Sequence, residues 1–149
     1  MEFDDLIKAG QLKKEHTSRQ KISEFLLFAE NEIEAAKFNI SRFPFTAYKS
    51  AYDALIHAGC ALIRHCGYRP TTKYTHATIT EFVARILGKD YEHLAARFKR
   101  MRRKRHPLQY EAKFLESQEE VKNSITQAEE LIRKIEEYIG IKSPRKRLF

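Results

Sequence analysis

Apolar residues recur along most of the chain at alternating steps of three and four positions, the spacing of one face of an α-helix. One such stripe consists of Ile22, Phe25, Leu26, Ala29, Ile33, Ala36, Ile40 and Phe43. A wider apolar face between Tyr48 and Ile63 is typical of the most buried helix of a bundle. A third stripe extends from Val121 to Ile139. No stretch alternates between apolar and polar residues as a half-buried strand does, and no internal repeat occurs.

Residues that start and stop helices divide these stripes into six predicted helices. Their predicted ranges are 3–14, 17–43, 46–66, 75–87, 90–106 and 117–139. Thr17 with Gln20, and Ser117 with Glu120, have the spacing of a capping box. The other expected caps are Thr75 or Thr78 and Asp90 at helix starts, and Gly67, Gly88 and Gly140 at helix ends.

Composition agrees with this pattern. Hydrophobic residues make up 42% and charged residues 32% of the 149 residues, as in soluble folded proteins, and there are only five Gly and four Pro. The expected fold class is all-α, a single up-and-down helical bundle of about five to six helices. It is expected to occupy residues 1–140, and a basic C-terminal tail follows at residues 141–149.

The sequence also suggests where the protein resides. It begins with Met-Glu-Phe-Asp-Asp, without the apolar core of a signal peptide, and it has no membrane-spanning run of about 18 apolar residues. Cys60 and Cys66 lie six residues apart on one predicted helix, so they face different sides of it and do not pair within it. Free thiols are typical of a reducing compartment. We therefore expect a cytoplasmic protein that does not contact a membrane.

Positive charge is concentrated in one segment. The formal net charge is +8, which favours a polyanionic partner, and seven of the nine residues from Arg97 to Arg105 are Lys or Arg. The apolar stripe that includes Phe98 and Met101 continues to Arg102 and Arg105, so we expect these two arginines to face inward. An inward guanidinium needs a carboxylate, a phosphate or a wet cleft. The cations expected on other faces, in water, are Arg97, Lys99, Arg103 and Lys104.

The end of this basic helix is the second constraint. Pro107 lacks an N–H and disfavours helical angles at His106, so the helix is expected to end or kink there. Arg105, His106 and Tyr110 would then cluster near a helix terminus.

Four stretches of the chain occur in a familiar order. They are Leu6–Leu12, Ala47–Ala54, Gly67 with Thr75–Thr78, and Arg102–Tyr110 before a long last helix. Their order and spacing resemble the HEPN family, the higher eukaryote and prokaryote nucleotide-binding domains, over nearly the whole chain. The resemblance implies a helical bundle that commonly dimerises. Many members are metal-independent ribonucleases, often toxins encoded beside a nucleotidyltransferase-like partner.

The resemblance also implies site residues. The family's motif is an arginine followed, after about four to six residues, by a histidine. The best alignment places Arg105 at the arginine, His106 at the polar residue after it and Tyr110 at the histidine, so this chain has Arg-x4-Tyr. A second alignment pairs Arg100 with His106 but takes the arginine off the inward stripe. The candidate catalytic residues are Arg105, His106 and Tyr110, and the candidate phosphate ligands are Arg100, Arg102, Arg103 and Arg105.

The tyrosine at the motif position changes the expected chemistry. Metal-free RNA cleavage needs a base for the 2′-OH, a proton for the leaving 5′-oxygen and positive charge around phosphorus. Arginine suits the last role and histidine the first two, whereas tyrosine, with a pKa of about 10, is a poor base. Cleavage should therefore be weak or absent unless His106 reaches the same cleft. Phosphate binding by Arg102 and Arg105 should persist.

Two classes of function remain at this point. The first is a homodimer with a degenerate motif that binds RNA or a nucleotide and needs no cofactor or metal. In this class, the protein either cleaves RNA, as a metal-independent endoribonuclease of toxin–antitoxin type, or only binds it. The alternative is a non-enzymatic module whose basic helix docks a nucleotidyltransferase-like or other acidic partner. DNA binding ranks last because no helix-turn-helix spacing is present. His57 and His65 are expected to be hydrogen-bonded structural residues, and His76 is expected at a helix start. A zinc site formed by His57, His65 and the two cysteines is disfavoured because these residues share no helix face.

Overall fold

The computed structural model describes residues 2–110 and 116–141, and in this part it describes every side chain except those of residues 106–110. In chain order, the elements are α1 (Asp4–Lys8), β1 (Leu12–Lys14), α2 (Arg19–Asn39), α3 (Pro44–His65), β2 (Tyr68–Pro70), α4 (Thr75–Leu87), the 3-10 turn η1 (Lys89–Tyr91), α5 (Glu92–Tyr110) and α6 (Gln118–Ile139). The predicted all-α bundle is therefore confirmed, with a small sheet added.

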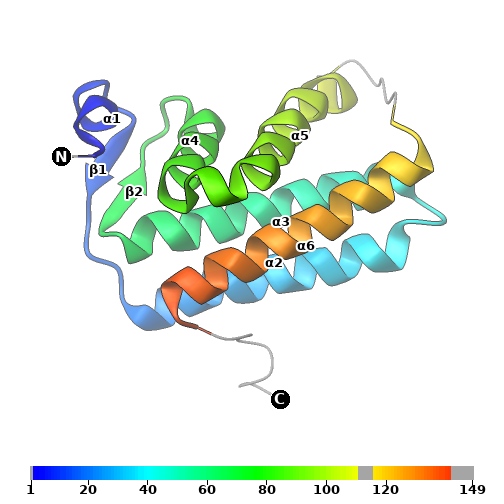
Figure 1. Ribbon diagram of the computed structural model, residues 1–149, viewed down its shortest axis with the longest axis horizontal. Helices are drawn as coiled ribbons and strands as arrows, with labels where there is room; N and C mark the ends of the chain where they lie inside the picture. Colours follow the sequence, from blue (N-terminus) through cyan, green and yellow to red (C-terminus); the bar gives the residue numbers. More distant parts are fainter. Residues whose placement is uncertain (1, 111–115, 142–149) are drawn as a thin grey trace.

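Helix α3 lies at the centre of the bundle (Figure 1). It packs lengthwise against α2 and α6, and α4 and α5 lie over its other side. The predicted wide apolar face is the reason: Tyr48, Leu55 and Ile63 are each almost completely buried. Gly59 brings α4 close, because a Cβ there would lie 2.4 Å from Cγ2 of Ile79.

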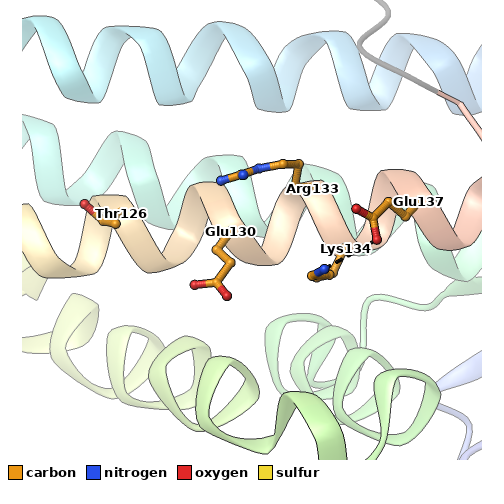
Figure 2. A pocket seen from close by; sticks show the side chains of 5 residues that line it. All are labelled: Thr126, Glu130, Arg133, Lys134 and Glu137. Carbon is orange, nitrogen blue, oxygen red and sulfur yellow. Dashed lines mark ion pairs between the residues drawn. The ribbon is translucent and has the colours of Figure 1, made fainter.

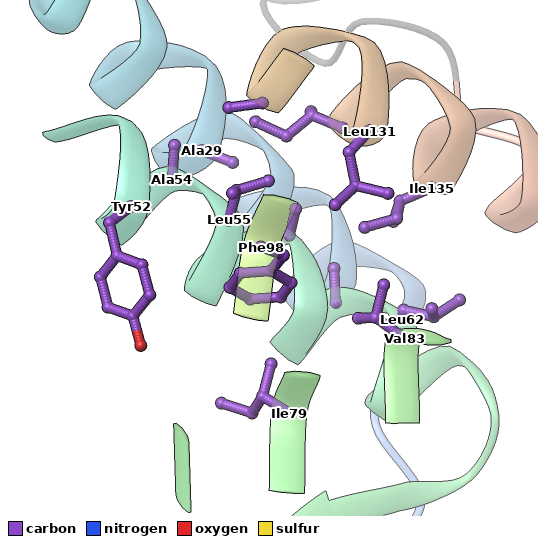
Figure 3. Packing of buried hydrophobic residues seen from close by; sticks show 14 of the residues in the cluster. Ala29, Tyr52, Ala54, Leu55, Leu62, Ile79, Val83, Phe98, Leu131 and Ile135 are labelled. Carbon is purple, nitrogen blue, oxygen red and sulfur yellow. The ribbon is translucent and has the colours of Figure 1, made fainter. Parts of the chain in front are cut away.

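The core is built from the predicted stripes of all the long helices (Figure 3). From α5 it receives the side chains of Leu94, Phe98 and Met101, each at most 1% exposed. The stripe that predicted the orientation of α5 is thus confirmed. Because this stripe is fixed in the core, the residues one turn further along α5 point toward α3 and α4.

The N-terminal region differs from the prediction. The helix expected over 3–14 ends at Lys8, where Gly10, with a φ of +76°, turns the chain. Strand β1 follows and pairs with β2 in an antiparallel sheet, with Leu12 opposite Pro70 and Lys14 opposite Tyr68. Each strand has only three residues, too few for an alternating pattern to be visible in the sequence.

Helix boundaries agree with the sequence at most points. Ser117 caps α6 by accepting a hydrogen bond from the N–H of Glu120 at 3.1 Å, as predicted. Gly67, Gly88 and Gly140 follow helix ends with positive φ, also as predicted. The cap of α2 is Ser18 rather than Thr17, and its hydroxyl accepts a bond from the N–H of Lys21 at 3.2 Å.

Three other boundary predictions are wrong. Thr75 and Thr78 do not cap α4, because their hydroxyls donate to the carbonyls of Thr71 and Tyr74 instead. Asp90 lies within η1, and α5 begins at Glu92. Of the two outcomes expected at His106, the helix end is wrong, because α5 continues to Tyr110. Because Pro107 has no N–H, α5 lacks the hydrogen bond to the carbonyl of residue 103. Residue 103 is exposed, so water can bond to that carbonyl instead.

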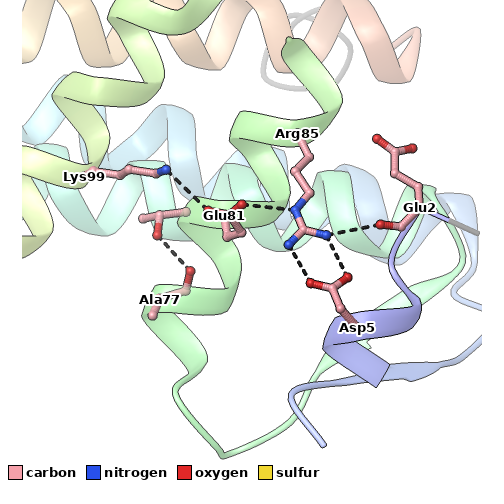
Figure 4. A network of polar contacts seen from close by, with 7 residues as sticks. Glu2, Asp5, Ala77, Glu81, Arg85 and Lys99 are labelled. Atoms are coloured by element: carbon pink, nitrogen blue, oxygen red, sulfur yellow. Dashed lines mark hydrogen bonds and ion pairs between the residues drawn. The ribbon is translucent and has the colours of Figure 1, made fainter. Parts of the chain in front are cut away.

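Polar contacts connect the ends of the helices to their neighbours. Arg85 of α4 donates to Asp5 of α1 at 2.7 and 2.9 Å and to Glu81 at 3.0 Å, and Lys99 of α5 donates to Glu81 at 3.3 Å (Figure 4). In the part of the chain that the structure describes, no helix has the length and apolarity needed to cross a membrane.

Candidate functional site

Most of the cations on α5 are neutralised by carboxylates of the same chain. These ion pairs connect α5 to α4, to α6 and to Glu116 just before α6, so the cations stabilise the bundle rather than remain available to a ligand. Arg97, expected in water, is only 18% exposed and also donates to Gln127 at 2.7 Å, so that expectation is wrong. The ion pairs are Arg97 with Glu120 at 2.9 Å, Lys99 with Glu81 at 3.3 Å, Arg100 with Glu116 at 3.1 Å and Lys104 with Glu116 at 3.7 Å.

Arg102 and Arg105 differ from these cations. Both are half-buried, as their place on the inward stripe predicts, and neither has an ion pair among the residues that the structure describes. The Nε atom of each is buried and has no hydrogen-bond partner in that same part of the chain. The guanidinium carbon of Arg105 lies 5.6 Å from the centroid of the Tyr52 ring, a cation–π contact. Buried polar atoms without a partner are unusual in a folded protein, and here they occur on the two arginines of α5 for which the described residues provide no carboxylate.

Tyr52 connects the arginines to a histidine on a third helix. It is completely buried in the middle of α3, and its hydroxyl points away from the apolar cluster (Figure 3). That hydroxyl and Nδ1 of His76 form a hydrogen bond of 2.8 Å. His76 is the second residue of α4 and is half-buried. Helices α3, α4 and α5 therefore bring together a phenol, an imidazole and two guanidiniums.

The charges around this group decide its protonation. Burial lowers the pKa of His76 below its ordinary value, the guanidiniums of Arg105 and Arg102 lower it further, and only Asp53 acts in the opposite direction. Burial also raises the pKa of Tyr52. At neutral pH the imidazole and the phenol are therefore both uncharged, and the site has the positive charge of two arginines beside a neutral proton acceptor.

The arrangement is suited to a phosphate group. Guanidiniums bind phosphate oxygens in a planar, bidentate geometry and remain charged at any physiological pH. A neutral imidazole next to the phosphate can accept a proton from a nearby hydroxyl. Among the described residues, no group of three or more His, Cys, Asp or Glu side chains is placed to hold a metal ion.

The structure distributes the predicted site residues unequally. Arg102 and Arg105 lie together in the site, Arg103 is exposed on another face of α5, and the guanidinium of Arg100 bonds to Glu116. His106 and Tyr110 occupy the last turn of α5, but their side chains lie outside the described part, as does the basic tail at residues 142–149.

Sequence reasoning missed Tyr52 and His76 as site residues. Tyr52 is one of several aromatics on the core face of α3, and nothing in its spacing separates it from Tyr48. His76 lies at the start of α4, as predicted, but a position at a helix start does not by itself indicate a role in a site. Only the packing of three helices brings positions 52, 76 and 105 together, although the Thr75–Thr78 stretch had already resembled a family pattern.

Other polar features lie away from this site. A hollow on the surface of α6 is lined by Thr126, Glu130, Arg133, Lys134 and Glu137, and the ion pair of Lys134 with Glu137 measures 3.5 Å (Figure 2). Cys60 and Cys66 are free cysteines, and burial raises the pKa of each thiol to about 11, so neither is an activated nucleophile.

Comparison with known proteins gives the family. The model of the HEPN domain matches residues 22–138, which extend from the first turn of α2 to nearly the end of α6 and thus include every residue of the site. No curated protein and no solved structure matches the chain. The bundle, the basic α5 and this match agree with one another. The chain therefore belongs to the HEPN domain family, at whose level the supported function is binding of nucleotides or RNA, or RNA cleavage.

Proposed function

We propose that this protein binds RNA by holding a backbone phosphate between Arg102 and Arg105, and that it cleaves the RNA without a metal ion. The observation that supports this most directly is the contrast along α5. The chain gives carboxylate partners to Arg97, Lys99, Arg100 and Lys104, but within the described residues it gives none to Arg102 and Arg105.

This contrast has an energetic meaning. A half-buried guanidinium that faces protein without a hydrogen-bonded anion destabilises the fold, and evolution retains such groups mainly where function needs them. A phosphate diester provides the missing negative charge and accepts hydrogen bonds in the plane of the guanidinium. It would also place its sugar beside His76 and Tyr52, the uncharged part of the site.

The positions proposed for the phosphate and its sugar also account for cleavage. In the transition state negative charge increases on the phosphate oxygens, and Arg102 and Arg105 would stabilise that charge. The family motif adds His106 and Tyr110 from the end of α5 as candidates for proton transfer. By the same resemblance we propose a homodimer of toxin–antitoxin type with a nucleotidyltransferase-like partner.

The competing function, docking of an acidic protein through α5, has less support. Such docking uses exposed, unpaired cations along one face. On α5 the cations outside the inward stripe are mostly paired with Glu81, Glu116 and Glu120. An acidic partner would have to displace these intramolecular pairs.

Binding and cleavage can be measured separately with a fluorescently labelled RNA in EDTA. An oligonucleotide with 2′-deoxy sugars binds but cannot be cleaved, so it reports affinity alone. We expect Arg105→Ala to weaken its binding about 10- to 100-fold, the value of a charge-assisted hydrogen-bonded contact, and to reduce the slope of log affinity against log salt by about 1. Cleavage of the all-ribose RNA should fall at least as much.

The matched control is Arg42→Ala, which removes the same charge from an exposed position in the turn between α2 and α3. It should leave affinity within about twofold, because a single distant charge contributes only through the general field. Equal affinities of wild type and Arg105→Ala, with both proteins folded, would contradict the proposal.

A further inference from the structure

We infer that His76, on α4, is the general base of RNA cleavage in this protein, held in place by Tyr52, and that it takes the role of the histidine that the motif on α5 lacks. This inference rests on the proposed function. It names a residue outside the motif segment, and its support is the geometry where three helices meet.

The first support is position. The hydrogen bond of 2.8 Å with the Tyr52 hydroxyl engages Nδ1, so Nε2 is the ring nitrogen left for a substrate. No hydrogen bond of Nε2 is present among the described residues. Tyr52 also lies under the guanidinium of Arg105. The phenol therefore contacts both Arg105, which is proposed to bind the phosphate, and His76, the candidate base, and it fixes the position of these two residues relative to each other.

The second support is charge. The groups that face His76 are Tyr52 and Asp53 from α3, and Arg102 and Arg105 from α5. The two guanidiniums and burial keep the imidazole neutral in the unliganded protein, which is the state that a base requires. A bound phosphate would cancel the repulsion from the arginines. The same imidazole then becomes a better proton acceptor once RNA is in place.

The proposed step is the transfer of the 2′-OH proton to Nε2 of His76. As the proton leaves, O2′ forms a bond to phosphorus and the bond from phosphorus to O5′ breaks. The products are a 2′,3′-cyclic phosphate and a 5′-hydroxyl, whose oxygen takes a proton from water. The imidazolium donates its Nδ1–H to the Tyr52 hydroxyl and later returns its Nε2 proton to solvent.

Tyr52 is a positioning residue in this scheme. Its hydroxyl can rotate, so it either donates to Nδ1 or accepts from Nδ1–H. Only the second arrangement leaves the lone pair on Nε2, and it is the arrangement that the protonated ring also needs. Burial raises the pKa of Tyr52, so it retains its proton and does not compete as a base.

The test compares His76→Gln with wild type under single-turnover conditions in EDTA. We expect cleavage to fall about 10²- to 10⁴-fold, the usual contribution of a general base, while binding of the 2′-deoxy oligonucleotide stays within about threefold. His65→Gln is the matched control. His65 is also a histidine with a lowered pKa, but it packs edge-on against Tyr138 at the C-terminal end of α3. It should cleave like wild type.

A pH profile separates a base from a structural residue. For wild type, kcat/KM should fall on the acidic side with a midpoint below the ordinary pKa of histidine, because burial and the two guanidiniums lower the pKa of His76, and kcat should fall already at higher pH, because bound RNA raises that pKa. Tyr52→Phe should move both midpoints and lower kcat with little change in KM. His76→Gln should lose this acidic limb.

Each result bears on the inference in one direction. It is overturned if His76→Gln cleaves like wild type, if it loses binding as strongly as cleavage, or if wild type binds RNA but does not cleave it. In all three cases loss of binding in Arg105→Ala would still support the phosphate site. If His76→Gln does not fold, NMR titration of the wild-type imidazoles decides. The pKa of His76, and not that of His65, should rise when the 2′-deoxy oligonucleotide binds, and an unchanged pKa overturns the inference.

Discussion

The cations of α5 show how side chains of one type on one helix acquire different roles. Arg97 has a carboxylate, an amide and a hydroxyl within 3.5 Å, and all three come from α6. Two turns later Arg105 lies over an aromatic ring and has no anion among the described residues. The first arrangement stabilises the bundle, and the second leaves an unbalanced charge. We therefore expect the same substitution to have opposite effects on the stability of the protein at Arg97 and at Arg105.

Replacing Arg105 with methionine should stabilise the protein. The unbranched side chain can still pack on Tyr52, and an unpaired, half-buried charge is removed, so we expect the free energy of unfolding to rise by about 1 kcal/mol and Tm by about 3 °C. Arg97→Met should lower both by a similar amount, because Glu120 and Gln127 lose their partner. Urea unfolding at pH 7 measures the two effects. Destabilisation of both variants would mean that Arg105 has a partner within the fold.

At the scale of elements, the close contact between α3 and α4 positions the site, because α4 bears His76 and α3 bears Tyr52. Gly59→Ala should separate the two helices. The new Cβ would lie 2.4 Å from Cγ2 of Ile79 and 3.4 Å from Cγ2 of Val83, so the contact must open. We expect a loss of about 1–3 kcal/mol, although alanine by itself favours a helix over glycine by about 1 kcal/mol.

A double-mutant cycle with Ile79→Ala checks the cause of this loss. If the clash is responsible, the double variant should be more stable than the sum of the single losses predicts, because the new methyl fills space that the isoleucine vacated. Simple additivity would show that the contact between Gly59 and Ile79 is not what Gly59→Ala disrupts.

The elements also show what sequence alone can predict. Periodicity located α2 to α6, and the orientation of α5 followed from Phe98 and Met101 because burial of a stripe fixes a helix about its axis. Strands β1 and β2 form because they pair with each other across more than fifty residues and because Leu12 and Tyr68 pack against the core, and no local pattern reports either contact. The residues of the site likewise fall into those that the sequence predicts and those that it does not. Arg102 and Arg105 were predictable because they share a helix with the stripe, whereas Tyr52 and His76 join them only through tertiary packing.

At the scale of the whole molecule, the two longest helices that flank α3 meet in a contact of like charges. Glu30 of α2 hydrogen-bonds to Glu136 of α6, and one carboxylate oxygen of Glu136 is buried without a partner in the described part of the chain. Two carboxylates can share such a bond only if one of them holds a proton. Burial, first, and Glu30, second, raise the pKa of Glu136 to about 8, against a weaker opposing effect of Arg133.

The stability of the bundle should therefore decrease as the pH rises through neutrality. The folded state retains a proton on Glu136 up to about pH 8, and the unfolded chain releases it near the ordinary value of 4.5, so folded molecules bind more protons between these limits. Unfolding releases that proton, and high pH favours the release. Glu136→Gln keeps the shape and a donor for Glu30 but does not titrate. Its Tm should exceed that of wild type by several degrees at pH 8.5, and the difference should disappear near pH 4.5.

Calorimetry across this range provides the measurement, and Glu137→Gln is the neighbouring control. Glu137 is 64% exposed and its only described ion pair is the surface contact with Lys134, so its variant should follow the wild-type curve at every pH. A constant offset between Glu136→Gln and wild type from pH 4.5 to 8.5 would show that no proton is shared between α2 and α6. A gap that widens with pH would mean that protonation of one buried carboxyl contributes to holding these two helices together.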